Sequence, residues 1–437
     1  MMHSSPHPSS PSPTPSRGID RRSILRLGAW SVPAMLLASA APTAAVAAPL
    51  RGPAQASAIA PFGQAWSSAG PDGTHWPLNT PRPTDAFDRV YRVAANWDAI
   101  GAAMNQAARL PVTSTVKIEV APGVLGNGWG AGSSAGGPMV EVPAGRTSNI
   151  LIVPAQGWGS VTAAGDARTS NGYSIVGLRK TTFAGFDFSN KIVLLRNCQD
   201  VAFAWSTFSS LNITANTAGA AGSIREVRNI EFVECVIPDA LNFSSSDTED
   251  RMAFRVGDNR PISGVRMVGC YVAPSYKAAG SSAHADSLQT SGSGTISGLV
   301  FEDSVFFQSS SQILQFANTS GVTLAHSLFV GGLRGTGRYP LAPDRHVMVG
   351  QNTLWGSATN VVATDTLVLG SASSSWRFTA VEDTLIANRT SPAGAFTLDT
   401  TSYGTQSTVL PDDVLDALAP YPTAGRMQAV WSSLAVA

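Results

Sequence analysis

The chain has 437 residues, of which 43% are hydrophobic and 13% are charged, against the ~25% charged residues of an average soluble protein. Helix surfaces usually carry more charge than this, so the composition excludes a coiled coil and argues against a mostly helical protein. Basic and acidic residues balance at 29 each, which argues against a nucleic-acid binder that relies on bulk positive charge.

The first 47 residues have the composition of an export signal. Residues 1–16 contain five prolines mixed with serine, and such a segment cannot bury a core. Arg21 and Arg22 are followed by a short apolar stretch, residues 27–40, and then by Ala45-Val-Ala47. Paired arginines, a short apolar segment and an A-x-A site resemble a twin-arginine signal. A membrane anchor is the alternative, but a spanning helix needs ~20 apolar residues.

We therefore expect residues 1–47 to be a signal peptide of a secreted bacterial protein, with no membrane association after cleavage. Its removal takes away four arginines and one aspartate, which leaves 25 basic and 28 acidic residues and a net charge of −3. A nearly neutral protein has no global field that steers a polyanion to it. Recognition of an acidic substrate must then be local.

Residues 48–94 are expected to be a linker and N-terminal extension, and residues 95–437 a single domain with terminal caps. A helix is predicted within residues 96–110, because apolar side chains recur there at helical spacing and Pro111 ends the segment. These side chains are Trp97, Ile100, Met104 and Ala107. Val116–Val120 then reads as the first strand, and the helix ahead of it covers an otherwise open sheet end.

An eight-residue pattern recurs through the body of the chain: apolar, x, apolar, x, x, small, x, apolar. It is clearest in residues 230–237, Ile-Glu-Phe-Val-Glu-Cys-Val-Ile. Apolar positions two apart lie on one face of a strand, and the extra residue before the small position lets the chain turn a corner. Such a unit buries its apolar face only by stacking on its neighbours. The pattern starts at Thr181, Val201, Ile230, Val265, Leu299, Val322 and Val347.

The sequence therefore predicts an all-β fold, a single-stranded right-handed parallel β-helix with an N-terminal capping helix. Propeller blades need ~40–45 residues, and the hairpin signals of a β-sandwich are scarce. A second helix is expected over residues 412–418, whose acidic start suits a helix N-terminus, and it is a candidate cap for the far end. Cys235 and Cys270 share the small position of neighbouring repeats, where we expect free buried thiols, although a disulfide also fits the spacing.

The repeats and the export signal resemble secreted pectate-lyase-like β-helix proteins, which include polysaccharide lyases and polygalacturonase-type hydrolases. The resemblance covers roughly residues 95–400 and rests mainly on periodicity. It implies a carbohydrate-active enzyme whose partner is a polysaccharide. The oligomeric state stays open.

The segment His284-Ala-Asp286-Ser-Leu288-Gln289 has the strongest chemical signal in the chain. It resembles the Asn-Thr-Asp-Gly-Ile segment of polygalacturonase-type β-helices, and Asp286 matches the catalytic aspartate of that segment. The next coil offers Ser311-Gln312 where that family has paired aspartates. The resemblance thus supports the fold and a site at Asp286 more than the hydrolytic mechanism.

Stacking in register predicts which side chains become neighbours on adjacent coils. Gly264 and Gly298 open two adjacent repeats, so we count back from them, and we align Leu314 with Leu288 for the following coil. The predicted neighbours are Arg255 with Gln289, Asp250 with His284, Gln289 with Gln315, and Asp286 with Gln312. An outward row of such side chains would form the wall of a groove.

β-Elimination on a uronate needs a cation on the carboxylate, a base for the α-proton and an acid for the leaving oxygen. Arg255 is the candidate carboxylate clamp. His284 is the candidate base, with Asp250 or Asp286 orienting it or binding a metal. The candidate substrate-binding residues are Gln289, Gln315, Gln312, Lys277 and Tyr276. A polysaccharide lyase is the leading interpretation.

Two further functions stay open. Asp250 and Asp286 are expected ~8 Å apart between backbones, within the ~6.5–9.5 Å of inverting glycoside hydrolases. A non-catalytic carbohydrate-binding or adhesion protein would use the polar row for contact only. In the purely structural interpretation, the His/Asp pair caps a turn and the glutamine side chains form a ladder that stabilises the stacked coils. No cofactor is certain, although the acidic run of residues 247–250 is compatible with calcium.

Overall fold

The computed structural model spans all 437 residues and describes residues 66–126, 140, 142–164, 172–216, 226–239, 250–351, 353–387 and 404–434. The chain separates into two units, Met1–Arg51 and Gly52–Ala437, and every described residue belongs to the second. The predicted signal peptide therefore lies outside the described residues. No helix within the described ranges is long and apolar enough to span a membrane.

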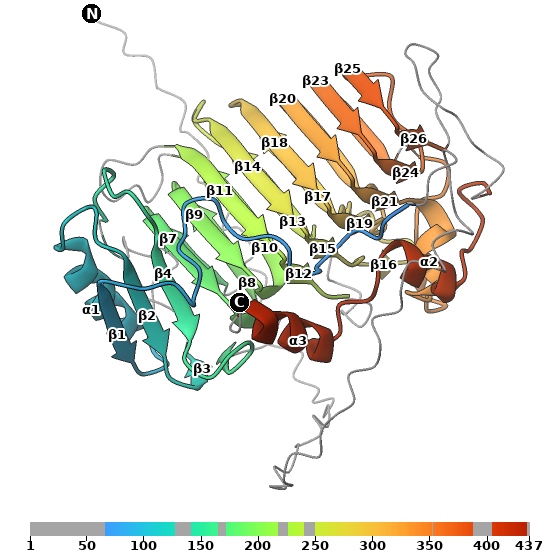
Figure 1. The fold of residues 1–437 in the computed structure, drawn as a ribbon. Helices are drawn as coiled ribbons and strands as arrows, with labels where there is room; N and C mark the ends of the chain where they lie inside the picture. The colour runs from blue at the N-terminus through green and yellow to red at the C-terminus, as the bar shows by residue number, and fades with distance from the viewer. Residues whose placement is uncertain are drawn as a thin grey trace, which may run out of the picture. The chain divides into compact units, whose positions relative to one another are not determined.

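Twenty-four strands form one sheet in which every pairing is parallel (Figure 1). Each coil passes through three faces in chain order, which we call faces A, B and C, and each face stacks on the same face of the next coil. This confirms the predicted all-β fold and is the arrangement of a right-handed parallel β-helix.

Face A carries the repeat. It consists of β1 (Arg89–Val93), β2 (Val116–Val120), β4 (Ile150–Pro154), β7 (Arg179–Ala184), β9 (Gln199–Ala204), β11 (Val227–Val233), β14 (Ile262–Val268), β18 (Ile296–Glu302), the later parts of β20 (Leu314–Ala325) and β23 (Leu354–Thr364), and β25 (Trp376–Glu382).

Faces B and C complete each coil. Face B consists of β3 (Gly123–Leu125), β5 (Val161–Ala163), the starts of β8 (Asp187–Arg196) and β10 (Thr207–Ala215), β12 (Val236–Ile237), β15 (Tyr271–Val272), β19 (Val305–Phe307), β21 (Leu328–Val330), β24 (Leu367–Leu369) and β26 (Leu385–Ile386). Face C consists of β6 (Tyr173–Val176), the ends of β8 and β10, β13 (Met252–Val256), β17 (Leu288–Gly292) and the starts of β20 and β23.

The remaining elements lie outside the coil. β16 (Lys277–Ala278) and β22 (Arg345–His346) form a separate antiparallel pair. The helical elements are α1 (Trp97–Ala108), the 3-10 helix η2 (Gly332–Gly337), α2 (Asp412–Leu418) and α3 (Ala424–Leu434).

Six of the seven predicted repeat starts stack in register. Thr181, Val201, Ile230, Val265, Leu299 and Val322 are successive cross-strand partners. The seventh prediction is wrong, because Val322 pairs with Val361 and not with Val347. Val347 instead lies in a long connection outside the coil and is buried in a second apolar cluster. The apolar pattern that begins at Val347 therefore belongs to a buried segment that is not a strand of the large sheet.

Left-handed residues bracket the face-A strands and explain why the repeat has a fixed length. One stands directly before the repeat and one at its fifth position, where the chain turns the corner into face B. The first column is Lys180, Asp200, Asn229, Gly264, Gly298, Gly321 and Asn360, and the second is Gly185, Trp205, Glu234, Gly269, Asp303, His326 and Asp365. Glycine, asparagine and aspartate adopt this conformation at the lowest cost.

The predicted N-terminal cap is present. Asn96 accepts a hydrogen bond from the backbone N–H of Ala99 at 2.8 Å and thereby begins α1. The predicted apolar side chains of α1 are buried in the core inside the coil. The first strand is β1, however, which pairs with Val116–Val120 and lies within the stretch expected to be an extension.

Two apolar cores hold the unit together. The first fills the coil, where aromatic rings stack from coil to coil, as Phe203 does on Phe183 and Phe232 with centroids 5.3 and 5.8 Å apart. The second lies outside the coil, against face B, and is covered by the C-terminal helices and by residues 66–83. We call residues 66–83 the N-terminal strap.

The N-terminal strap runs across successive coils toward β1 (Figure 1). At one end the N–H of Gly70 donates to the carbonyl of Asp303 at 2.7 Å, and at the other Asn79 accepts from the N–H of Asn149 at 2.8 Å. The predicted helix over residues 412–418 is present as α2, but Leu415 and Leu418 pack into the second core. α2 therefore lies along the side of the coil and not over its far end.

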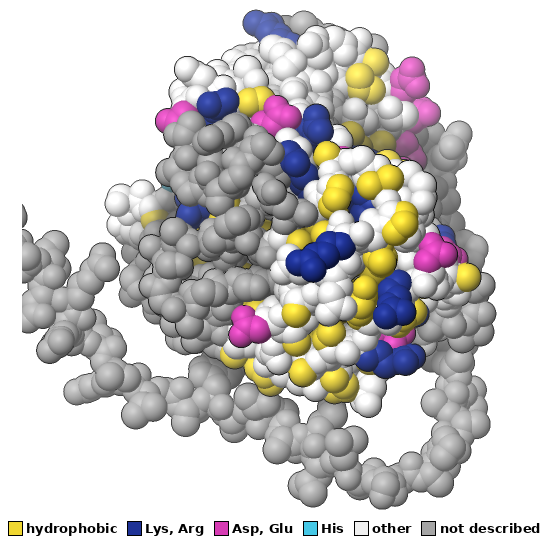
Figure 2. Space-filling model, turned by 90° about the vertical axis from the view of Figure 1, so that its left-hand side faces the viewer, with side chains coloured by type: hydrophobic (Ala, Val, Ile, Leu, Met, Phe, Trp, Pro, Cys, Tyr) yellow, Lys and Arg dark blue, Asp and Glu magenta, His cyan; other side chains and the backbone are white. Residues whose placement is uncertain are grey.

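One side of the described unit shows how its surface charges are distributed. On the side that carries α1 and β1, Lys and Arg side chains lie scattered among hydrophobic ones (Figure 2). This scattered arrangement agrees with the balanced composition.

Candidate functional site

The predicted site begins at the turn that leads from face B into face C. Continuing the register of β13 and β17 back by three residues places Asp250 beside Asp286. The backbone N–H of Asp286 donates to Oδ1 of Asp250 at 3.0 Å, and Oδ1 of Asp286 accepts from the N–H of Gln312 at 2.8 Å. The two carboxylates thus satisfy the backbone of the following coil, and Gln312 lies beside Asp286 as predicted.

His284 and Asp286 form a hydrogen-bonded pair. Nδ1 of His284 lies 2.9 Å from Oδ2 of Asp286, and the histidine side chain is 44% exposed while the aspartate side chain is fully buried. An ionised carboxylate only accepts hydrogen bonds, so Asp286 holds the proton on Nδ1 and leaves a lone pair on Nε2. This arrangement suits a general base.

Burial governs the charge state of Asp286. It raises the pKa of the carboxyl group, against the opposing effect of the Gln312 N–H and of His284 and Gln289. As the pH falls, Asp286 therefore takes up its proton earlier than an exposed aspartate does. Protonation would weaken its hold on the imidazole of His284.

A row of outward side chains runs from this pair across face C. Gln289 donates from Nε2 to Oδ2 of Asp286 at 3.4 Å, and its cross-strand neighbours in turn are Gln315, as predicted, and Trp355. We call Gln289, Gln315 and Trp355 the face-C row. Oε1 of Gln315 is buried and has no hydrogen-bond partner among the described residues, so this row is more than a closed ladder of amides.

Arg255 does not lie where the sequence placed it. Its cross-strand neighbour is Ser291, and the neighbour of Gln289 is Ala253. The turn after β13 spans residues 257–261, whereas the turn after β17 spans residues 293–295, and these two extra residues shift the register. The N–H of Arg251 bonds to the carbonyl of Asp286, so Arg255, four residues further along, lies ~13 Å from that level.

Asp250 is likewise displaced from its predicted place beside His284. It lies at the level of Asp286, one strand spacing of ~4.8 Å away, and not two residues further along. The residue is only 9% exposed. Asp247 and Glu249, which with Asp250 formed the candidate calcium site, lie outside the described residues.

Lys277 and Tyr276 support the site from beneath. Tyr276 is buried, and its hydroxyl donates to the carbonyl of Tyr339 at 3.2 Å, so it does not cover a substrate from the surface. Nζ of Lys277 donates to the carbonyl of Ala283 at 2.6 Å. Lys277 therefore fixes the loop that presents His284.

The sequence analysis missed a second cluster of titratable groups, at the corner between faces A and B. His75 of the N-terminal strap lies between two acids, with Nδ1 2.9 Å from Glu234 and Nε2 2.8 Å from Asp303. His326 bonds through Nδ1 to Asp303 and through Nε2 to the hydroxyl of Ser67, the latter at 2.7 Å. We call Glu234, His75, Asp303 and His326 the corner cluster.

Gly269 makes room for this cluster. It occupies the left-handed column between Glu234 and Asp303, at φ 62°, and a Cβ there would lie 2.9 Å from the Glu234 carboxyl group and 3.2 Å from Nδ1 of His75. His75 thus fills the place of a missing side chain. The sequence feature that could have revealed this cluster is the fifth position of the repeat, directly before the small residue. It holds Glu234, Asp303 and His326 in three of the repeats, but the repeat pattern left this position unspecified.

Ion pairing sets the charge of the corner cluster. Burial by itself lowers the pKa of His75, but hydrogen bonds with Asp303 and Glu234 outweigh it and raise the pKa to about 10. Burial raises the pKa of Glu234 to about 7. Burial also acts to raise the pKa of Asp303, but the two histidines hold it well below its usual value.

Carboxylate oxygens and His75 also come close enough to share a cation, in the sets Asp72, His75, Glu234 and His75, Glu302, Asp303. Both ring nitrogens of His75 already lie at hydrogen-bond distance from carboxylates. The contacts of the corner cluster therefore hold the N-terminal strap against the coil.

Comparison with known proteins adds no family name. No protein-family model matches the chain, and no curated protein matches its sequence. The function must be argued from the geometry alone.

Proposed function

We propose that this protein is a secreted carbohydrate-active enzyme that cleaves a uronate-containing polysaccharide by β-elimination. The observation that carries the proposal is the pair of His284 and Asp286, in which a buried carboxylate orients an exposed imidazole beside a row of amide side chains. A general base needs this combination of fixed orientation and access to substrate.

In this mechanism Nε2 of His284 removes the proton alpha to the uronate carboxylate. The electron pair of that C–H bond forms a C=C bond, the glycosidic C–O bond on the neighbouring carbon breaks, and the leaving oxygen takes up a proton from a solvent water molecule. Asp286 stabilises the imidazolium ion that forms on His284. Arg255, ~13 Å further along the strand direction, would bind the carboxylate of a neighbouring sugar residue and not that of the attacked one.

Hydrolysis with inversion has less support. Inverting carboxylates stand ~6.5–9.5 Å apart with a water between them. Asp250 and Asp286 lie at the same level on adjacent coils, and both are nearly or fully buried and bonded to backbone N–H groups. Neither is free to activate water or to protonate a leaving group.

Carbohydrate binding without cleavage is the second candidate. The observation that favours it is the exposed indole of Trp355 at the end of the face-C row, since 42% of this residue is exposed. Exposed aromatic rings on a rigid strand are typical platforms for ligands.

The test is to incubate the purified protein with a panel of uronate polysaccharides, with and without EDTA. Ultraviolet absorbance reports unsaturated products, and reducing ends are followed in parallel. We expect both signals from the wild type and a loss of at least ~100-fold in His284→Ala, because a general base contributes about that much. His346→Ala, at another exposed histidine, is the matched control and should retain activity.

Three outcomes contradict parts of the proposal. Reducing ends without absorbance would replace the lyase by a hydrolase. Full activity of His284→Ala would remove this residue from the mechanism. Glycan binding with neither product signal would establish the binding protein.

A further inference from the structure

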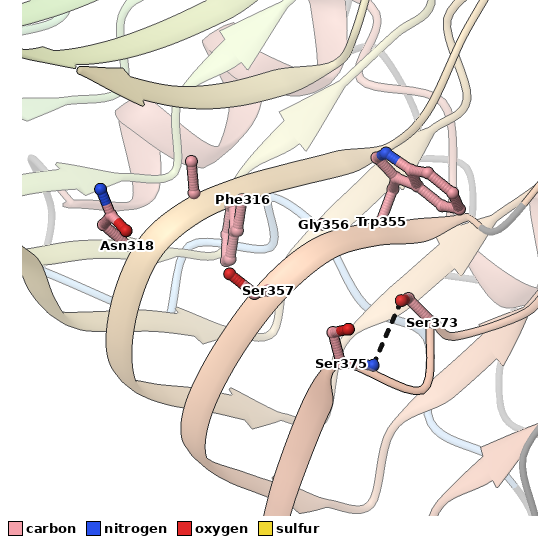
Figure 3. A pocket seen from close by; sticks show the side chains of 8 residues that line it. Phe316, Asn318, Trp355, Gly356, Ser357, Ser373 and Ser375 are labelled. Carbon is pink, nitrogen blue, oxygen red and sulfur yellow. Dashed lines mark hydrogen bonds between the residues drawn. The ribbon is translucent and has the colours of Figure 1, made fainter. Parts of the chain in front are cut away.

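An open pocket of about 320 Å³ lies where face C passes into face A near the C-terminal end of the coil (Figure 3). It is lined by Phe316, Ala317, Asn318, Trp355, Gly356, Ser357, Ser373 and Ser375. None of these side chains is charged. The pocket therefore combines an aromatic ring with hydroxyl and amide groups.

The position of Trp355 is fixed by the strand beneath it. The residue is 42% exposed, while its backbone carbonyl accepts from Nε1 of the buried Trp376 at 3.0 Å. The preceding residue, Leu354, points into the core and is fully buried. An apolar ring is thus held at the surface by a rigid element, at little further cost in entropy on binding.

Gly356 shapes the floor of the pocket. Its φ is 73°, and a Cβ at this position would lie 2.0 Å from the backbone carbonyl oxygen of Phe316. The register between β20 and β23 shifts here, between Phe316 and Thr319. The resulting bulge bends the strand so that Ser357 and Trp355 border the same hollow (Figure 3).

Polar groups at the rim are available to a ligand. Ser357 and Ser375 are exposed, and their hydroxyl groups have no hydrogen bond to another described residue. The backbone N–H of Ser375 donates to Oγ of Ser373 at 3.2 Å, and its carbonyl accepts from the N–H of Ala358 at 3.4 Å. Asn318 donates weakly to the carbonyl of Gly292 at 3.4 Å, and its amide oxygen has no hydrogen bond to another described residue. A ring with several hydroxyl groups fits such a rim.

The pocket continues the candidate active site. Trp355 is the cross-strand neighbour of Gln315, and Gln315 is that of Gln289, so Trp355 lies two strand spacings, ~9.6 Å, from Gln289. Oε1 of Gln315, between them, is buried and has no partner among the described residues. A polymer lying across face C would meet His284 and Trp355 with different sugar units.

We propose that this pocket binds a neutral pyranose unit, stacked on Trp355 and hydrogen bonded by Ser357, Ser375 and Asn318. The inference rests on the proposed polysaccharide substrate and adds that the polymer carries neutral sugars beside its uronates. A uronate carboxylate in this pocket would lose hydration without gaining a cation from any lining residue. A neutral ring meets no such penalty.

Isothermal titration calorimetry tests the inference with cellohexaose, mannohexaose and galactohexaose as neutral probes and with hexagalacturonate as the charged comparison. We expect at least one neutral probe to bind better than hexagalacturonate. Trp355→Ala should weaken that binding by about tenfold or more, as the loss of an aromatic anchor does. Trp355→Phe should keep most of it, and Tyr421→Ala, at an aromatic residue of similar exposure, 38%, should leave it unchanged.

The outcome of this binding test can be distinguished from that of the cleavage test. Unchanged binding in Trp355→Ala, or no binding of any neutral probe at millimolar concentration, overturns the pocket even if His284-dependent cleavage is found. Trp355-dependent binding in a protein that releases no product from any uronate polysaccharide keeps the pocket and overturns the lyase.

Discussion

At the scale of single residues, the chemistry of this protein depends on which polar atoms are already committed to the fold. Asp286 bonds both to the backbone and to a side chain. Its Oδ1 accepts from the backbone N–H of Gln312, and its Oδ2 lies at hydrogen-bond distance from Nδ1 of His284. The sequence left Asp250 and Asp286 as alternative partners of His284, and the structure pairs His284 with Asp286. The sequence did not predict how deeply Asp286 is buried.

The cysteines allow a direct check at this scale. Cys198, Cys235 and Cys270 are free and buried, which confirms the expectation for Cys235 and Cys270 at the small position of the repeat. Burial raises the pKa of Cys198 to about 12 and that of Cys270 well above its usual value, so reactive thiolate is scarce. We expect Ellman's reagent to label these thiols only after denaturation, and the melting temperature to be the same with and without dithiothreitol. A drop in melting temperature on reduction would indicate a disulfide.

At the scale of elements, the face-A strands were predictable and the turns were not. Apolar alternation and a fixed distance between left-handed residues specify the register of Ile230, Val265 and Leu299. Turn length between faces C and A follows no pattern in the sequence, and two extra residues were enough to misplace Arg255. The N-terminal strap has no periodicity at all, because its partners lie on many different coils.

The strap also gives a prediction with a defined pH dependence. The pKa of His75 is raised to about 10 in the folded protein, so its ion pair with Asp303 contributes fully below ~6.5, the ordinary value of histidine, and this contribution is lost as the pH rises through about 10. Glu234, whose pKa burial raises to about 7, is mostly protonated below ~6.5 and adds no ion pair there. Asp303 has a lowered pKa, so its contribution is present above ~3.9, the ordinary value of aspartate, and is lost as the pH falls below that.

We therefore expect His75→Gln to lower the free energy of unfolding by about 1 kcal/mol, a figure reduced by solvent screening, between about pH 4 and pH 6.5. Urea unfolding at a series of pH values measures the difference, which should shrink toward pH 11 and toward pH 2. Asn79→Ala, at an exposed residue of the same strap whose side chain makes no hydrogen bond to the corner cluster, should show no such pH profile. A difference that stays constant with pH would mean that His75 contributes packing only.

At the scale of the whole unit, two kinds of contact stabilise the coil. Neighbouring coils are close in sequence, whereas the strap reaches very distant partners, as when Nε1 of Trp66 donates to the carbonyl of Leu418 across 352 positions. Closing such a loop costs chain entropy, and this cost is offset only once the coils that the strap contacts have folded. This is also why sequence periodicity predicted the coil but not the second core.

We expect the strap to dock last during refolding. Pulsed hydrogen exchange should protect the amide of Met267, within β14, before the amide of Asp72, which donates to the side chain of Glu234 at 2.7 Å. Simultaneous protection of the two amides would show that the strap takes part in forming the coil.

The constant spacing of the left-handed residues around face A has a consequence for how such a protein can change over time. Each cassette spans six residues including its two left-handed limits, as from Asn229 to Glu234, and the variation in length falls into the connections. A whole winding can then be duplicated or deleted by recombination without disturbing its neighbours. Each insertion would extend face C by one increment of ~4.8 Å, so the length of the proposed polymer-binding surface can evolve independently of the proposed general base, His284.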